Sequence, residues 1–204
     1  MSARAKSFAA RLLVYAGASF SMTVLLFIMG YILVRGIPHL SPALFAWEYN
    51  SENVSLTPAL INTLYMTVLS LAFAVPLGVG AAIYLSEYAK RSSRLVKVVR
   101  LTAETLSGIP SIIYGLFGAL FFVVTLRMNL SLMAGALTLS IMILPLIMRT
   151  TEEALLAVPD AYREGSFGLG AGRLRTTLKI VLPSAAPGIL AGVILGIGRI
   201  VGET

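Results

Sequence analysis

Long apolar runs and short charged segments alternate along the chain. Four runs without a charged residue are 18 to 26 residues long: 12–34, 60–85, 109–126 and 130–148. A fifth run, 185–204, is apolar as far as Val201 apart from Arg199. An α-helix rises about 1.5 Å per residue, so runs of this length cover a hydrocarbon core of roughly 30 Å. The pattern predicts an all-α, polytopic bundle of transmembrane helices with five spans.

Composition supports a membrane protein. Hydrophobic residues make up 57% of the chain, and its mean hydropathy is +0.88, well above the usual range of soluble domains. The chain has no cysteine, so disulfides and thiolate metal sites are excluded. His39 has no second ligand at a metal-binding spacing. We therefore expect neither a metal nor a cofactor.

Basic residues gather in three segments that alternate spans place on one side of the membrane. These segments are the N-terminal tail 1–11, the loop after residue 85 and the loop 149–184, and they hold 13 of the 16 basic residues. Basic residues mark the cytoplasmic side. The tail and the loop 149–184 are therefore predicted to be cytoplasmic and the loop 35–59 extracytoplasmic. Because the basic residues lie beside membrane spans, membrane lipid accounts for the net charge of +7, and no nucleic-acid partner is needed to explain it.

The first apolar run is expected to remain in the mature protein. Its 23 residues exceed the about 7–15 residues of a signal-peptide core. A small-residue cleavage site is also missing. In the nearest candidate, Ala43-Leu44-Phe45-Ala46, leucine stands where a small residue is needed. The run is thus predicted to be a membrane anchor.

The loop 149–184 is unusual for a connection between spans, because its 36 residues carry 9 of the 25 charged residues. Four glycines interrupt it: Gly165, Gly168, Gly170 and Gly172. Glycine readily adopts positive φ and ends helices. The pattern predicts two short helices set at an angle, presenting a surface to a soluble partner. A solvated basic loop beside anionic lipid is the alternative.

The spacing within this loop follows a known pattern. Glu164 is followed by Gly165 and Ser166, then after fixed gaps by Gly170, Ile180, Leu182 and Pro183. This resembles the cytoplasmic EAA loop of ATP-binding-cassette importer permeases, which reads Glu-Ala-Ala, three residues, Gly, nine residues, Ile, one residue, Leu-Pro. The sequence departs from it only at the two alanines. The resemblance implies that these seven residues couple the chain to an ATPase.

Other segments resemble the phosphate importer permeases of the PstA type. They are AVPLGVGAAIYLSEY (74–88), GIPSIIYGLFG (108–118), IMILPLIMRTTEEALL (141–156) and GIGRIVGET (196–204). The sister permeases of the PstC type share some of these elements, but the stretch 149–153 favours the PstA side. The resemblance covers roughly residues 62–204.

The resemblance implies a type I importer permease fold in a bacterial inner membrane, with a sixth span after Thr204. It also implies a sister permease subunit, a cytoplasmic ATPase dimer and an extracytoplasmic phosphate-binding protein, with phosphate as the transported substrate. A permease for another oxyanion or small solute remains an alternative. A passive channel or secondary transporter would have no reason to carry the loop spacing.

The chain is not expected to be an enzyme. A phosphate-binding P-loop needs a lysine directly after its second glycine. Gly165 and Gly170 have the required spacing, but Ala171 stands at the lysine position. The sequence offers no catalytic triad and no paired carboxylates in a plausible cleft. Any ATP hydrolysis must therefore come from a partner.

Four charged residues are candidates for the substrate path. Arg199 lies inside an apolar run, where an arginine is costly and usually faces protein or water. It either pairs with Glu203 one turn away, or contacts an anion through its planar fork of donors. Arg149 and Glu152 stand at the cytoplasmic end of the fourth span and match charged positions in the family. They either line an exit or mark the headgroup boundary.

The last span carries Gly188, Gly192 and Gly196 on one face. Small residues at this spacing allow two helices to approach closely. They would also permit bending during transport, and the spacing fits both interpretations.

Overall fold

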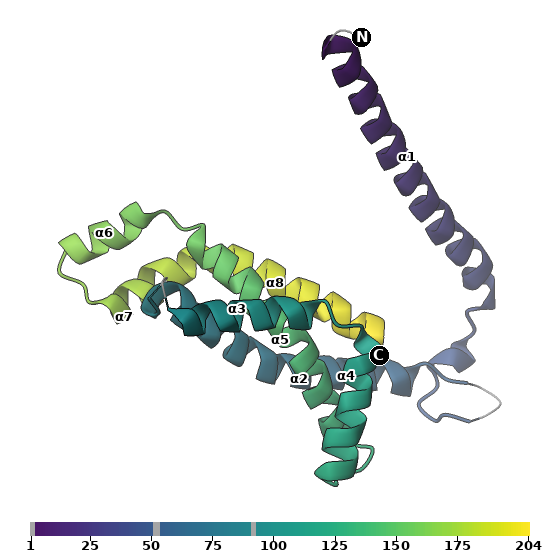
Figure 1. Cartoon of the computed structure of the whole chain (residues 1–204). Helices are drawn as coiled ribbons and strands as arrows, with labels where there is room; N and C mark the ends of the chain where they lie inside the picture. The colour runs from purple at the N-terminus through teal and green to yellow at the C-terminus, as the bar shows by residue number, and fades with distance from the viewer. Residues whose placement is uncertain (1–2, 51–53, 91–92) are drawn as a thin grey trace. The chain divides into compact units, whose positions relative to one another are not determined.

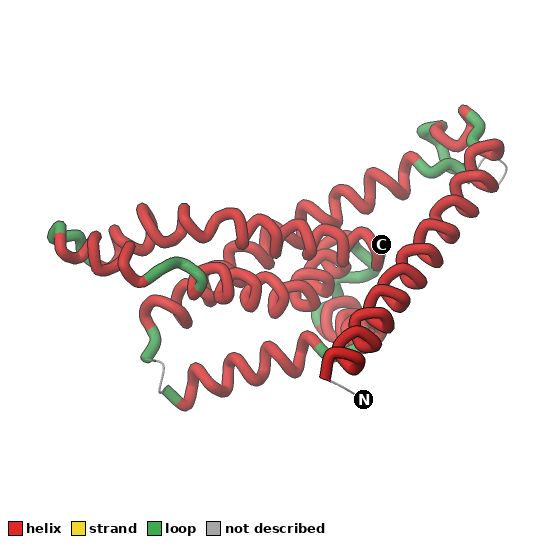
Figure 2. Tube along the Cα trace, turned by 90° about the horizontal axis from the view of Figure 1, so that it is seen from above, coloured by secondary structure: helices red, strands yellow, loops and turns green. Residues whose placement is uncertain are grey.

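The computed structural model describes residues 3–50, 54–90 and 93–204. Within these ranges all regular structure is helical, as Figure 2 shows. Residues 1–2 of the expected tail, residues 51–53 of the expected extracytoplasmic loop, and Arg91 lie outside the described residues. The chain divides into two units, residues 1–58 and residues 59–204.

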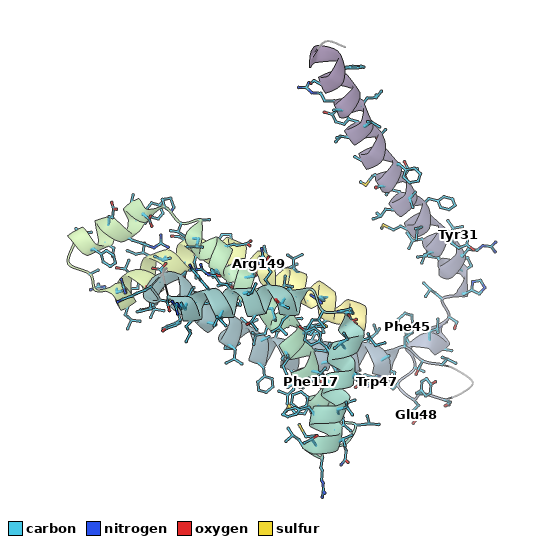
Figure 3. The ribbon with its side chains drawn as sticks, in the orientation of Figure 1. Tyr31, Phe45, Trp47, Glu48, Phe117 and Arg149 are labelled. Atoms are coloured by element: carbon cyan, nitrogen blue, oxygen red, sulfur yellow. The ribbon has the colours of Figure 1, made fainter. Side chains whose placement is uncertain are left out.

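The N-terminal unit is built on one long helix, α1 (Ala3–Gly36), drawn in purple in Figure 1. Its apolar residues are spread around the whole helix, which is typical of a helix buried in a membrane. Two short 3₁₀-helices follow, η1 (Ile37–His39) and η2 (Pro42–Phe45). Phe45 and Trp47 in this part of the chain are exposed (Figure 3).

The second unit contains the remaining helices. In chain order they are α2 (Thr57–Ile83, which begins at the unit boundary), η3 (Tyr84–Tyr88), α3 (Arg94–Ser107), α4 (Ser111–Gly118), η4 (Ala119–Thr125), α5 (Leu132–Leu156), α6 (Asp160–Gly168), α7 (Arg173–Thr176), η5 (Thr177–Val181) and α8 (Leu182–Glu203). The elements η3, η4 and η5 are π-helical turns that continue the helices before them. Among the described residues, four helical stretches are long and apolar enough to cross a membrane: Ala10–His39, Thr57–Tyr88, Leu132–Leu156 and Arg173–Glu203.

The third apolar run belongs to a bent pair of helices. Helices α3 and α4 meet at an angle of 101° (Figure 1). The bend falls at Gly108, Ile109 and Pro110, because proline disfavours the α conformation in the residue before it and has no amide hydrogen to donate. The structure thus places a helix at 94–107, where the sequence predicts a loop. This helix brings charged side chains alongside α5.

Helix α5 is the centre of the second unit. Its residues Ile143, Ile147 and Leu155 are completely buried. The glycine face of α8 packs directly on it: a Cβ atom at position 188 would lie 2.6 Å from the Ala154 Cβ, and one at 196 would lie 3.2 Å from the Ile147 Cδ1. At Gly192 a Cβ atom would overlap the Thr150 side chain. The glycine stripe therefore serves close packing of α8 on α5.

Polar contacts connect α2 with α5 in the same core. The Ser70 hydroxyl donates to the carbonyl of Ala136 (3.1 Å), and the Ser140 hydroxyl donates to the carbonyl of Ser70 (3.0 Å). All three residues are buried. Hydrogen bonds of this kind hold helices together in a membrane, where lipid gives no hydrophobic driving force. They fix α2 against α5.

Candidate functional site

The loop between α5 and α8 contains one separate helix, α6. It begins after Pro159 with Asp160, whose negative charge suits the positive end of the helix. The sequence predicts a second separate short helix in the basic segment after Gly172, but the structure does not have one. Instead α7 continues through the π-helical turn η5 into α8 as one helical stretch, residues 173–203. The loop is therefore one short helix placed beside the start of a long one.

Gly170 ends α6 in a Schellman motif. The amide of Gly170 donates to the Phe167 carbonyl (2.9 Å), and the amide of Ala171 donates to the Ser166 carbonyl (3.1 Å). Gly170 has a φ of +82°, which a residue with a side chain rarely adopts. No atom would lie within 4 Å of a Cβ at this position. The glycine is thus required by the backbone conformation and not by space.

Ser166 is the point at which α6 packs on α7. Its side chain is buried, and its hydroxyl lies 2.8 Å from the hydroxyl of Thr176, which is also buried. A larger side chain would separate the two helices. Gly165, the other small residue of the motif, is exposed and has open space where a Cβ would be. Only one of the two small positions is therefore required by packing within the chain.

Several side chains of α6 and of its C-cap Leu169 are exposed, and they include a carboxylate as well as apolar groups. Glu164 is exposed, and so are Tyr162, Phe167 and Leu169, the last with 91% of its surface accessible. A cleft of about 630 Å³ separates α6 from the start of α8, and four motif residues line it: Gly165, Ser166, Ile180 and Pro183. Leu182 instead packs against the buried core of the unit. The structure thus gathers most of the predicted coupling residues around one cleft.

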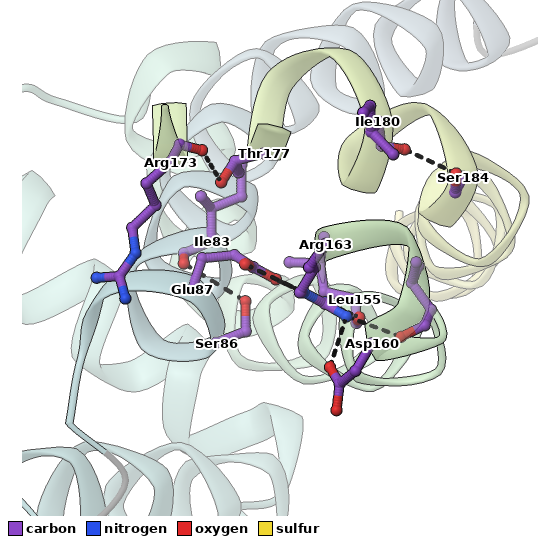
Figure 4. A network of polar contacts seen from close by, with 11 residues as sticks. Ile83, Ser86, Glu87, Leu155, Asp160, Arg163, Arg173, Thr177, Ile180 and Ser184 are labelled. Carbon is purple, nitrogen blue, oxygen red and sulfur yellow. Dashed lines mark hydrogen bonds and ion pairs between the residues drawn. The ribbon is translucent and has the colours of Figure 1, made fainter. Parts of the chain in front are cut away.

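Arg163 is a site residue that the motif spacing does not reveal. Its Nη2 donates to Glu87 Oε1 (2.7 Å) and its Nε to the same carboxylate (3.2 Å), although 76 residues separate the two (Figure 4). Only 15% of the Arg163 side chain and 9% of the Glu87 side chain are exposed. The hydrogen bond to Glu87 raises the pKa of the Arg163 guanidinium above its usual value, so the guanidinium is charged at neutral pH.

A second charged cluster joins α3 to the C-terminal half of α5. Arg100 Nη2 lies 2.5 Å from Glu152 Oε1, and the Glu152 side chain is only 10% exposed. Arg149, labelled in Figure 3, is exposed and pairs with Glu153 (3.2 Å) and more loosely with Glu104 (3.5 Å). These residues surround a cavity of about 270 Å³. Two of the four predicted path residues therefore belong to one cluster.

The other two predicted path residues lie at the end of α8. Arg199 is half-buried and Glu203 is exposed. Within the described part of the chain, no ion pair joins them. Glu203 lines a cavity of about 670 Å³ together with Asn62 and Thr138. The structure thus does not bring Arg199 and Glu203 together with Arg149 and Glu152.

The described side chains offer no group of three or more His, Asp or Glu that could hold a metal ion. The ion pairs of Arg100 with Glu152, Arg149 with Glu104 and Arg163 with Glu87 instead connect different helices. The site is therefore a helical surface held in place by buried polar contacts.

Residues 74–204 match the family described as binding-protein-dependent transport system inner membrane component, and the chain belongs to this family. The resemblance seen in the sequence is confirmed. The chain is 42% identical over 146 residues to the phosphate transport system permease protein PstA 1 of Mycobacterium tuberculosis, covering 72% of this chain and 47% of that protein. It is 38% identical to PstA of Pasteurella multocida, covering 91% of this chain and 66% of that one.

The fold is shared with a solved importer. A structure of the MetNI methionine ABC transporter in an inward-facing conformation superposes with a TM-score of 0.58 at 25% identity, covering 72% of this chain and 68% of that one. The predicted class, an all-α polytopic permease fold, is confirmed. The chain spans about half to two thirds of the length of the curated relatives that it matches.

Proposed function

We propose that this chain is the transmembrane permease subunit of an ATP-driven phosphate importer, and that it couples the transport path to a cytoplasmic ATPase. One observation carries the proposal: α6 ends in a glycine cap, rests on α7 through Ser166, and exposes Glu164 beside apolar side chains. A short amphipathic helix held in this way is a docking element for another protein. The similarity to phosphate permeases of the PstA type supports phosphate as the substrate.

The partners follow from this assignment. A sister permease completes the path, an ATPase dimer binds α6 and the cleft beside it, and an external phosphate-binding protein delivers the substrate. The chain itself is the non-catalytic subunit. The basic residues of segments 1–11 and 149–184 support a cytoplasmic position for the N-terminus and α6, in a bacterial inner membrane.

The substrate path uses Arg149 and Arg199 as anion contacts. Arg149 is exposed and holds its carboxylate partners loosely, so phosphate can replace them at little cost. Arg199 is half-buried in α8, where a guanidinium offers its fork of donors to a partly dehydrated anion. Glu152, which lines the same cavity as Arg149, and Glu203, one turn after Arg199 in α8, complete the proposed path.

Reconstitution tests this function. The chain, in its full-length protein, is co-expressed with the sister permease and the ATPase, purified, and inserted into proteoliposomes with the phosphate-binding protein. We expect uptake of radiolabelled phosphate that requires hydrolysable ATP and is not reduced by excess sulfate. Competition by sulfate would indicate another oxyanion as the substrate. Uptake without ATP would contradict the proposal and indicate a passive path.

A further inference from the structure

Helices α6 and α7, which lie on either side of the glycine break in the loop, both contact η3, the π-helical turn that continues α2. Arg163 of α6 binds Glu87, and the guanidinium of Arg173 in α7 lies 5.8 Å from the centre of the Tyr88 ring, a cation–π distance. Glu87 and Tyr88 are neighbours in the π-turn η3. Figure 4 shows Glu87 between the residues of α6 and those of α7. Helices α6 and α7 thus meet η3, although at least 76 residues separate the contacting residues along the chain.

Arg163 also holds the end of α5. Its Nη1 donates to the carbonyl of Val158 (2.8 Å) and its Nη2 to the carbonyl of Leu155 (2.9 Å). The last carbonyls of a helix have no partner within the helix and carry its negative end charge. All three guanidinium nitrogens therefore donate hydrogen bonds. Their acceptors are Glu87 in η3, the carbonyls of Leu155 and Val158 at and just after the end of α5, and Asp160 in α6.

We propose that Arg163 and Glu87 form a mechanical link that makes α6, the end of α2 and the end of α5 move as one body when the ATPase moves α6. The inference rests on the proposed coupling function, and it makes both residues positioning residues. A lysine has its three donors on a single nitrogen and cannot reach acceptors spread as widely as those of Nε, Nη1 and Nη2, so the planar fork of arginine is needed to hold all three helices. Because the pair is buried, α6 cannot shift relative to α2 without leaving charges unpaired.

Asp160 provides the matched control. It binds the same guanidinium through Nη1 (3.2 Å), but its side chain is 77% exposed. An exposed ion pair contributes little, since water solvates both groups when it opens. The link therefore depends on Glu87 and not on Asp160.

The test is a distance between α2 and α6 in the assembled transporter. The chain has no cysteine, so spin labels can be attached at Tyr84→Cys and Ala161→Cys, two exposed positions in η3 and α6. Pulsed electron resonance then measures the distance with and without ATP. We expect one narrow distribution in both states for the parent protein and for Asp160→Asn. For Glu87→Gln and Arg163→Lys we expect a longer, broader distribution once ATP binds, and loss of most uptake while ATP hydrolysis continues.

Several outcomes would overturn the link: an ATP-dependent distance in the parent protein, unchanged distances in both variants, or loss of the ATPase from the purified variants. The last result would mean that the pair only maintains the docking surface. Phosphate uptake by the parent protein tests the proposed function independently of the link. A transporter that does not import phosphate contradicts that function, while the distance still judges the link.

Discussion

The hydroxyl of Ser166 lies 2.8 Å from the hydroxyl of Thr176, and this contact joins α6 to α7 across the glycine break of the loop 149–184. Thr176 also donates to the carbonyl of Gly172 (3.2 Å), so it keeps a hydrogen-bond partner when Ser166 is replaced. The contact therefore depends more on the size of residue 166 than on its hydroxyl group.

Ser166→Ala is expected to be nearly neutral and Ser166→Leu harmful. The alanine variant loses one hydrogen bond, about 0.5–1.5 kcal/mol. The leucine variant forces a large side chain between α6 and α7, at a cost of about 1–3 kcal/mol. Limited proteolysis of the loop in membranes measures the difference, with faster cleavage expected for leucine only. Equal protection of both variants would show that α6 does not need this packing.

Gly170→Val is expected to uncouple the ATPase without preventing membrane insertion. A β-branched residue at a φ of +82° costs about 1–3 kcal/mol, which alters the end of α6. Glu164→Lys should have a similar effect by reversing the charge of the exposed face. Gly168→Ala is the control, because Gly168 is helical with open space around it. Co-purification of the ATPase and phosphate uptake are the measurements; full uptake by both variants would mean that the loop is an ordinary connection.

Replacing Arg100 or Glu152 singly should destabilise the protein, whereas replacing both together should be tolerated. Removing one partner leaves a largely buried charge, and breaking a buried pair costs about 3–5 kcal/mol, less here because Arg100 is 40% exposed. The double variant Arg100→Gln, Glu152→Gln removes the uncompensated charge. Thermal unfolding in detergent compares the three variants, and Glu153→Gln is the exposed control. A double variant no more stable than either single one would show that the pair is not the source of the stability.

The predicted orientation can be tested with single cysteines at positions 48, 94 and 173. An impermeant thiol reagent added to intact cells should label only position 48, because the basic-residue distribution puts Arg94 and Arg173 inside. Permeabilised cells should label the other two as well. Labelling of position 94 or 173 in intact cells would reverse the topology.

The sequence predicts the fold class and the glycine-capped loop because these depend on local patterns. Apolar run length predicts helices, and the glycines between 165 and 172 predict a helix break, which the structure has at Gly170. The extent of α3 is missed because charged residues such as Arg100 and Glu104 obscure a helix that packs on α5. The Glu87–Arg163 contact is missed for a different reason. It joins segments that only the tertiary arrangement brings together, and no spacing along the chain encodes it.

Arg199 is expected to act as an anion contact and not as the partner of Glu203. Since the described residues contain no ion pair between the two, neutralising both should not restore what the loss of the arginine removes. Arg199→Lys should be impaired, because a lysine keeps the charge but loses the forked donors. Arg199→Gln should lower uptake by about tenfold or more, which corresponds to at least about 1.4 kcal/mol of barrier. The double variant Arg199→Gln, Glu203→Gln should remain as inactive as Arg199→Gln. Uptake rates at matched expression measure all three, and recovery in the double variant would mean that Arg199 only balances a carboxylate during folding or transport.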